Sequence, residues 1–137
     1  MPERIILDCD PGHDDAIALL LAFASPEIEL VGVTTVAGNQ TLEKTTANAL
    51  RILEFSARAD ITVAAGADRP IVREPYVAKY VHGETGLDGP DLPQAQGSPL
   101  DEHAVDFLGR HADGATLVAV GPLTNVGLML ALYPEAR

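Results

Sequence analysis

The sequence predicts an α/β fold in which helices cover both faces of a doubly wound, mostly parallel sheet. Short apolar stretches typical of buried strands alternate along the chain with longer stretches that suit helices. Glycines and prolines separate the two kinds of stretch. The length of 137 residues suits a single domain, residues 1–137. Right-handed crossovers between parallel strands then bring the carboxyl ends of the strands to one edge of the sheet.

The first strand, turn and helix are the stretch around which the rest of the chain is organised. Residues 5–7 form an apolar run typical of a strand that is buried on both faces. Pro11 and Gly12 interrupt this run. From Asp14 onward the residues suit a helix, with acidic side chains in its first turn and Pro26 just past its end.

The same alternation predicts the later elements. Strands are expected at residues 28–36, 61–65 and 116–120, and helices at 41–57, 101–111 and from 121 to about 134. Thr41 and Asp101 are the candidate N-caps of two of these helices. The candidate core positions of the helices are Leu42, Ala49, Ile52, Leu53, Phe55, Val105 and Leu108.

Residues 66–100 differ from the rest of the chain because prolines and glycines recur throughout them. A loop of this length inside a compact domain is usually functional or disordered. It also holds side chains that could contact a ligand, among them Tyr76, Tyr80, His82, Glu84 and Asp88. We therefore predict that residues 66–100 form a mobile active-site flap within the domain.

Composition and charge exclude several classes of function. The formal net charge of −11 argues against binding to nucleic acid or to an anionic membrane, which both need basic surfaces. No apolar run is long enough to cross a bilayer, and no secretory leader is expected at the start of the sequence. Cys9 is the single cysteine and is expected to be a small buried residue. A lone cysteine is consistent with the reducing cytoplasm.

Four aspartates crowd the end of the first strand: Asp8, Asp10, Asp14 and Asp15. Two carboxylates about 6 Å apart repel each other by roughly 3 kcal/mol at an effective dielectric constant near 20. Such a cluster raises its own pKa values or requires a cation. Oxygen ligands alone favour calcium or magnesium over zinc. A solvated acidic turn would account for Asp14 or Asp15 but not for Asp8 and Asp10, so a ligand site is predicted at this edge of the sheet.

Several motifs identify a family resemblance. They are Asp-Cys-Asp-Pro-Gly-His-Asp-Asp-Ala at residues 8–16, Val-Thr-Thr-Val-Ala-Gly-Asn at 33–39, His-Gly-Glu at 82–84 and Gly-Pro-Leu-Thr-Asn at 121–125. The sequence resembles the inosine-uridine-preferring nucleoside hydrolases from one end to the other. The resemblance implies a Rossmann-like core, here truncated, because family members are longer and the chain resembles their amino-terminal half.

The resemblance implies a calcium-dependent N-ribohydrolase, which cleaves the bond between base and ribose in a ribonucleoside. By this likeness Asp10 and Asp15 correspond to calcium ligands, and Val120 to a position whose backbone carbonyl binds the ion. Asp10 also corresponds to the general base that takes a proton from calcium-bound water. The family's oxocarbenium-like transition state is one that nearby carboxylates stabilise.

The resemblance also assigns substrate contacts. Asp14 resembles the residue that binds the ribose hydroxyls, Asn39 a further polar contact near the ribose, and His82 a flap histidine near the nucleoside. An exposed loop histidine remains the alternative for His82. Asp8 is expected to support the ligands from behind or to be purely structural, and His13 to be non-catalytic.

Three further polar side chains are expected to lie outside the chemistry. His103 and His111 flank a predicted helix and are expected at the surface. Asn125 matches a family position, but it is expected to stabilise the start of its own helix.

The amino-terminal resemblance also limits what is expected of the chain. Further calcium, ribose and leaving-group residues of the family lie in its carboxyl-terminal half, so the chain alone is expected to be inactive. The apolar strand at 117–120 would have an uncovered edge and favours a homo-oligomer or pairing with another chain. Purine and pyrimidine preference stay open.

Two other functions remain as alternatives. One is a non-catalytic half-domain that binds ribose, calcium or a partner. The other is a haloacid-dehalogenase-like phosphatase, suggested by Asp8 and Asp10 but disfavoured by Gly12 and by the unexplained pair Asp14 and Asp15.

Overall fold

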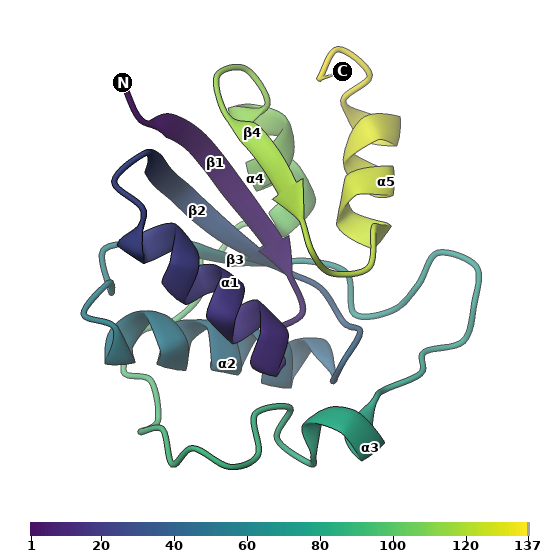
Figure 1. Ribbon diagram of the computed structural model, residues 1–137. Helices are drawn as coiled ribbons and strands as arrows, with labels where there is room; N and C mark the ends of the chain where they lie inside the picture. The colour runs from purple at the N-terminus through teal and green to yellow at the C-terminus, as the bar shows by residue number, and fades with distance from the viewer. Residues whose placement is uncertain (137) are drawn as a thin grey trace.

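A four-stranded parallel sheet forms the centre of the molecule (Figure 1). The computed structural model describes residues 1–136. The strand order is β3-β2-β1-β4, and all three neighbouring pairs are parallel. The strands are β1 (Glu3–Cys9), β2 (Ile28–Thr35), β3 (Val63–Ala65) and β4 (Thr116–Ala119). Because the strands are parallel, their carboxyl ends all meet at one edge of the sheet.

Helices cover both faces of the sheet, which confirms the predicted doubly wound architecture (Figure 1). One face carries α1 (His13–Ala24) and α2 (Leu42–Phe55), and the other carries α4 (Ala104–His111) and α5 (Thr124–Leu132). A single short helix, α3 (Lys79–His82), lies within the long loop at 66–100. No helix in the described part of the chain is long and apolar enough to cross a bilayer.

Two hydrophobic cores form because neighbouring side chains of β1 point to opposite faces of the sheet. Ile5, Leu7 and Cys9 pack into the core beneath α1 and α2. Ile6 packs into the core beneath α4 and α5. By this alternation Asp8 shares the face of Ile6 and points toward the layer of α4 and α5.

Three predictions about individual elements are wrong in detail. Phe55 is 69% exposed and lines a surface groove with Ile17 of α1, because it is the last residue of α2 and extends past the sheet. The helix after the long loop begins at Ala104, and its cap is His103 rather than Asp101. The His103 Nδ1 atom accepts a hydrogen bond from the Val105 N–H at 3.2 Å.

Side chains of α2 and of the segment before it hold residues 83–85 of the loop at 66–100. Gln40 donates to the carbonyl oxygens of Gly83 and Glu84, and Asn48 donates to that of Thr85. Whether this loop moves as a flap stays a prediction.

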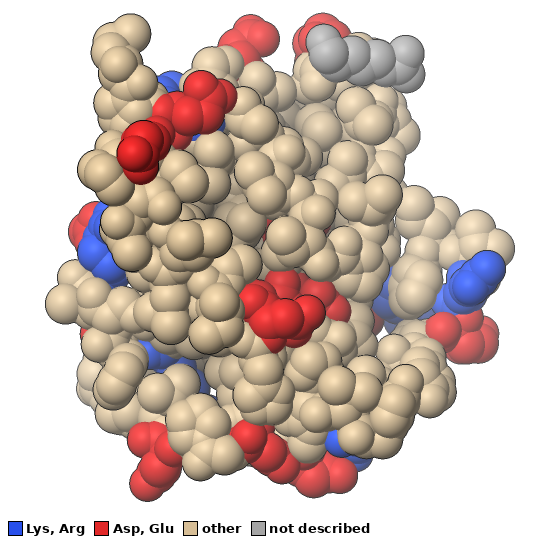
Figure 2. Space-filling view, in the orientation of Figure 1, with Lys and Arg blue, Asp and Glu red and all other residues tan. Residues whose placement is uncertain are grey.

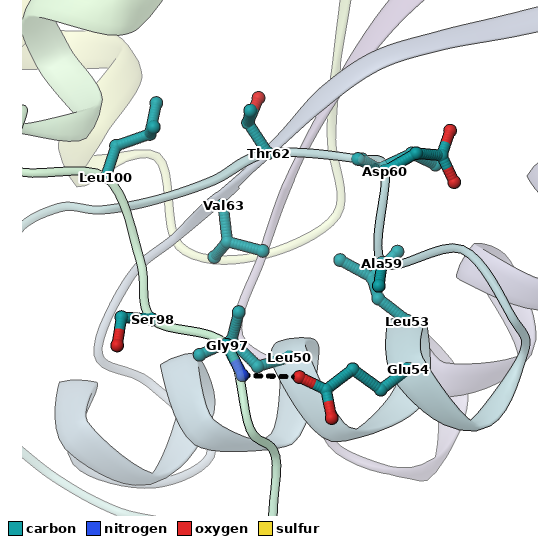
Figure 3. A pocket seen from close by; sticks show the side chains of 11 residues that line it. Leu50, Leu53, Glu54, Ala59, Asp60, Thr62, Val63, Gly97, Ser98 and Leu100 are labelled. Carbon is teal, nitrogen blue, oxygen red and sulfur yellow. Dashed lines mark hydrogen bonds between the residues drawn. The ribbon is translucent and has the colours of Figure 1, made fainter.

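The end of the loop borders a pocket of about 150 Å³ between α2 and the start of β3. Figure 3 shows the Glu54 carboxylate in this pocket accepting a hydrogen bond from the Gly97 N–H. The pocket lies beside the carboxyl end of α2, so it is at the opposite edge of the sheet from the aspartate cluster.

Candidate active site

The carboxyl ends of the strands bring most of the predicted site residues together. Asp10 follows β1, Asn39 lies in the turn after β2, and Val120 follows β4. Asp14 and Asp15 lie in the first turn of α1. In Figure 2, acidic atoms gather on the face where Figure 1 shows the start of α1. The site predicted at this edge is therefore an acidic cluster framed by three strand ends and one helix start.

Asp10 is buried, and the backbone after β2 holds its carboxylate. The Asn39 N–H donates to Asp10 Oδ2 at 2.6 Å, and the Asn39 side-chain amide donates to the Asp10 carbonyl at 3.1 Å. Burial raises the Asp10 pKa to about 6, and the charges of Asp14 and Asp8 add to the rise. A carboxylate with this pKa accepts a proton readily near neutral pH.

Asp15 is buried beside Asp10 and has spare hydrogen-bonding capacity. Its Oδ2 atom accepts from the Gly12 N–H at 3.3 Å and from the Asn39 amide at 3.4 Å. Its Oδ1 atom is buried and has no hydrogen-bond partner among the described residues. Burial, followed by the charge of Asp10, raises the Asp15 pKa to about 7. Buried oxygen atoms usually have a partner. Asp8 Oδ2 also lacks one, but Asp15 lies beside Asp10 at the strand ends, where a single missing ligand would serve both carboxylates.

Two glycines leave the space around the Asp10 carboxylate open. A Cβ atom added to Gly38 would lie 2.2 Å from Asp10 Oδ2, and one added to Gly121 would lie 2.9 Å from Asp10 Oδ1. Larger residues at either position would therefore displace the carboxylate. The motifs at 33–39 and 121–125 thus contribute backbone as well as side chains to the site.

Asp8 and Asn125 form a separate, fully buried cluster behind the site. The Asp8 Oδ1 atom accepts from Thr34 Oγ1 at 2.6 Å and from Asn125 Nδ2 at 2.8 Å. Asn125 also donates to the Thr35 carbonyl at 3.0 Å and accepts from the Ala67 N–H at 2.9 Å. Asn125 was expected to stabilise the start of its own helix, and this is wrong. It crosslinks β1, β2 and the segment after β3.

His82 is buried against the turn at the start of α1 rather than exposed on the loop. A Cβ atom added to Gly12 would lie 2.7 Å from His82 Nδ1 and 3.0 Å from Asn39 Nδ2. The charge of His82 lowers the Asp15 pKa, against the larger effects that raise it. Its neighbour His13 lies 3.2 Å away, measured between the two Nδ1 atoms. The structure therefore brings His82 to the aspartate cluster.

The remaining predicted residues lie at the rim of the cluster. The Asp14 side chain is exposed, and its charge adds to the rise in the pKa values of Asp10 and Asp15. The Val120 N–H donates to the Asp8 carbonyl at 2.9 Å, which fixes this strand end beside Asp10. The Val120 side chain is 47% exposed, so nothing buried depends on its shape.

The cluster fits a hard cation in its chemistry but supplies only part of a coordination shell. Asp10 and Asp15 offer carboxylate oxygens, one of them buried without a partner. Within residues 1–136, however, no three His, Cys, Asp or Glu side chains come together in an arrangement that could hold a metal ion. Calcium takes about six to eight oxygen ligands. Backbone carbonyls, water, substrate or further protein groups must therefore complete any calcium shell.

A cavity of about 210 Å³ adjoins the cluster on the side of the long loop. Gly38 and Pro122 line it from the strand ends, and Tyr76 lines it from the loop. Tyr76 was noted in the sequence only as one of several loop side chains. The loop thus forms one wall of this cavity beside the aspartate cluster.

Sequence reasoning missed two features of the site region, for different reasons. The role of Asn125 depends on contacts with strands far away in the chain, and only its presence in a motif could have drawn attention to it. His13 was expected to be non-catalytic because it lies inside the turn, at a position where members of the resembled family often carry an apolar residue; the structure pairs it with His82.

Curated relatives resemble the chain closely but are longer. Pyrimidine-specific ribonucleoside hydrolase RihA of Photobacterium profundum is 55% identical over 139 residues, covering 98% of this chain and 45% of the relative. The protein of the same name from Klebsiella pneumoniae is 53% identical, covering 96% of this chain and 43% of the relative. The chain therefore spans a little under half the length of the curated relatives that it matches.

Solved structures resemble the fold along the whole chain. The plant nucleoside hydrolase PpNRh1 superposes with a TM-score of 0.91 at 36% identity, covering 99% of this chain and 45% of the neighbour. The purine-preferring ribonucleoside hydrolase from Gardnerella vaginalis superposes with a TM-score of 0.94 at 31% identity, covering 98% of this chain and 45% of the neighbour.

The family description itself covers almost the entire sequence. Residues 5–137 match the model of the family described as inosine-uridine preferring nucleoside hydrolase. This match contradicts the phosphatase alternative, because that fold does not account for the motifs after β2 and β4. The chain belongs to the inosine-uridine preferring nucleoside hydrolase family.

Proposed function

We propose that this chain carries the calcium-binding and water-activating part of a ribonucleoside hydrolase active site. The reaction is hydrolysis of the N-glycosidic bond, which yields a free base and ribose. The observation that carries the proposal is the pair Asp10 and Asp15, buried side by side with raised pKa values and one unpartnered oxygen. Such a pair is costly to bury without a cation or a proton.

The proposed calcium ligands are the carboxylates of Asp10 and Asp15 and the backbone carbonyl of Val120. Bound calcium would relieve the repulsion between the carboxylates and lower the pKa of a coordinated water. Only oxygen donors are offered by these groups, and oxygen is what calcium prefers. Calcium in particular, rather than magnesium, is proposed from the family resemblance.

Asp10 is proposed as the general base. Its carboxylate lies at the end of β1, and the backbone N–H of Asn39 holds one of its oxygens at 2.6 Å. This contact fixes the direction in which the other oxygen can accept a proton from the attacking water. The surrounding carboxylates also favour the positive charge that grows on the ribose as the base departs.

The proposed substrate contacts are Asp14, Asn39 and His82. Asp14 is exposed at the rim of the cluster, where a carboxylate can accept hydrogen bonds from a pair of ribose hydroxyls. Asn39 lies between Asp10 and Asp15, and His82 covers Gly12. We propose pyrimidine ribonucleosides as the preferred substrates, because the RihA relatives at 53–55% identity are named pyrimidine-specific.

Two wider proposals concern assembly and cellular location. The β4 strand lies at an edge of the described sheet, which favours assembly into a homo-oligomer or with another polypeptide along this edge. The single cysteine is buried, consistent with a cytoplasmic location.

A calcium-binding half-domain without turnover is the second candidate function. It is favoured by the coverage of the relatives, since the chain spans a little under half of their length and the two carboxylates supply only part of a calcium shell. The two candidates differ in whether the chain releases ribose.

Calorimetric calcium titration and a ribose-release assay test both candidates. We expect calcium to bind with a Kd of about 10⁻⁴ to 10⁻³ M, in the range of sites with limited ligand charge. Asp15→Asn should weaken binding at least about tenfold, a change of about 1.4 kcal/mol. Any ribose released from uridine, cytidine or inosine should require calcium and should disappear in Asp10→Asn.

Asp113→Asn is the matched control, because it removes the same charge from an exposed turn before β4, at the opposite edge of the sheet. It should leave calcium binding unchanged. Absence of calcium binding, or equal binding by Asp15→Asn, would contradict the proposal. Calcium binding without ribose release from any nucleoside would favour the half-domain.

A further inference from the structure

His13 and His82 form a chain of hydrogen bonds that runs from the long loop into the site. The His13 Nε2 atom lies 2.9 Å from the Asp88 carbonyl oxygen. The His13 Nδ1 atom lies 3.2 Å from His82 Nδ1, and the two ring planes are 25° apart with centroids 5.5 Å apart. His13 is the first residue of α1, whereas His82 ends α3. The contact therefore joins two elements that are 69 residues apart.

The directions of these hydrogen bonds follow from the chemistry of their ends. A carbonyl oxygen can only accept, so His13 Nε2 must carry a proton and donate it to Asp88. A neutral imidazole has one protonated nitrogen, which leaves His13 Nδ1 as an acceptor. His82 Nδ1 must then donate to His13. It follows that His82 Nε2 carries no proton when the ring is neutral.

The loop around Asp88 is built firmly enough to act as the fixed end of this chain. The Asp88 carboxylate accepts from the N–H groups of Glu84 and Thr85, both at 3.0 Å. The Asp88 N–H donates to the His82 carbonyl at 3.3 Å, which closes the turn between them. Gly83 permits this turn with a φ of +77°. The Asp88 carbonyl oxygen near His13 therefore belongs to a turn that is closed by hydrogen bonds.

His82 Nε2 is the free end of the chain. Among residues 1–136 no hydrogen bond engages this atom. A Cβ atom added to Gly12 would lie 2.7 Å from His82 Nδ1 and 2.8 Å from His82 Cε1, so this edge of the ring faces the turn before α1. The Nε2 atom is bonded to Cε1, and a bare Nε2 is a hydrogen-bond acceptor for a ligand hydroxyl or N–H group.

We propose that His13 is a positioning residue that holds His82 in the Nδ1–H tautomer, so that Nε2 faces a bound nucleoside as an acceptor. This inference rests on the proposed role of His82 at the nucleoside. The uncommon tautomer follows from the contact with His13 and not from His82 itself, because Nε2–H is the form that free histidine prefers. His82 in this state accepts from a ribose hydroxyl or from the N–H of a base.

Nitrogen NMR of the ¹⁵N-labelled 137-residue chain tests the proposal without substrate or calcium. The spectra are recorded well above the ordinary histidine pKa of about 6.5, so that neutral rings dominate. We expect His82 with a protonated Nδ1 and a bare Nε2, and His13 with the reverse. A protonated Nε2 on His82, or a protonated Nδ1 on His13, would overturn the proposal.

Variants of His13 separate tautomer control from simple attachment of the loop. His13→Asn keeps an acceptor near the Nδ1 position and should retain the His82 tautomer. His13→Gln keeps a donor near the Nε2 position for Asp88 but loses that acceptor, so His82 should shift to Nε2–H. His13→Ala should cause the same shift. Unchanged His82 spectra in both Gln and Ala variants would overturn the proposal.

His103→Asn is the matched control, since it alters an exposed histidine that caps a different helix. It should leave the His82 tautomer unchanged. Because the spectra are read in the absence of calcium and nucleoside, the tautomer proposal can fail while the proposed hydrolase function stands. Conversely, if the chain neither binds calcium nor releases ribose, the proposed hydrolase function fails, but the His82 tautomer measured in these spectra is unaffected.

Discussion

Two groups of aspartates at the end of one strand have opposite environments. Asp8 is fully buried, and two side chains donate to one of its oxygens, Thr34 and Asn125. Asp10 and Asp15 lie two and seven residues further on, beyond the end of β1, where one N–H group donates to the Asp10 carboxylate and two donate to that of Asp15. Asp8 Oδ2 and Asp15 Oδ1 are both buried without a partner among the described residues, so the two environments differ in position rather than in spare oxygen atoms. Asp8 is enclosed between β1 and α5, whereas Asp10 and Asp15 lie at the strand ends, which supports the catalytic role proposed for the pair.

Alternation along the strand explains why the two groups separate. Asp8 points into the layer of α4 and α5, where the start of α5 places Asn125. Asp10 lies beyond the last paired residue of β1, where the sheet no longer covers it. Residue type alone does not distinguish the two positions. The neighbours that the fold supplies to each carboxylate do.

The largest expected effect comes from a matched pair of asparagines, one in each group. Asn125→Ala removes three hydrogen bonds and leaves buried partners unpaired, so it should lower the free energy of unfolding by about 3 kcal/mol or more. Asn39→Ala removes weaker contacts at a half-buried site and should cost about 1 kcal/mol. Urea unfolding measures both. Equal losses of unfolding free energy in the two variants would contradict the distinction between the Asp8 cluster and the cluster of Asp10 and Asp15.

The second-largest expected effect is the pH dependence of stability, to which Asp10 and Asp15 should contribute most. The folded pKa values of Asp10 and Asp15, about 6 and about 7, lie above those of unfolded aspartate. The folded state therefore binds protons more tightly, so stability without calcium should rise as pH falls through 7 and 6. This added stability should be lost again as pH rises through the same range.

Asp15→Asn provides the test of this assignment. Without the Asp15 carboxyl group, the change in unfolding free energy between pH values above 7 and below 6 should become smaller. Saturating calcium should have a similar effect in the original chain, because cation binding and protonation compete for the same oxygens. A pH slope that Asp15→Asn leaves intact would show that other groups cause it.

The smallest expected effect concerns the buried cluster of Asp8, Thr34 and Asn125. Thr34→Val removes the hydroxyl that donates to Asp8 at 2.6 Å but leaves the Asn125 contact in place. We expect a loss of about 1 kcal/mol in the free energy of unfolding, with calcium binding unchanged. Thr62→Val, at an exposed position before β3, is the matched control and should be neutral. Weaker calcium binding in Thr34→Val would mean that the two groups are coupled.

The prediction of the fold succeeded where local patterns are strong. Apolar runs and turn residues located the four strands and the helices around them, and the alternation of strands and helices gave the parallel sheet. Predictions failed at the ends of elements, as for Phe55 and Asp101. Burial of a residue at a helix end depends on whether another element packs against it. The identity of the capping residue depends on the path of the loop that precedes the helix.

The placement of the site followed from topology, whereas its internal contacts did not. Parallel strands with right-handed crossovers bring Asp10, Asn39 and Val120 to one edge whatever the loops do. The partner of Asn125 could not be predicted in the same way, because Asp8 is 117 residues away. The pairing of His13 with His82 likewise requires the loop at 66–100 to fold back onto α1.

Local patterns in the sequence were enough to predict the order of strands and helices, the family, and the set of carboxylates at the end of β1. Those features depend on side-chain periodicity and on residues adjacent in the chain. Tertiary contacts determine which groups donate to each carboxylate, and which nitrogen of His82 is left without a partner. Hydrogen bonds and burial are set by residues distant in sequence, and their combined effect exists only once the sheet and the loop have closed around them.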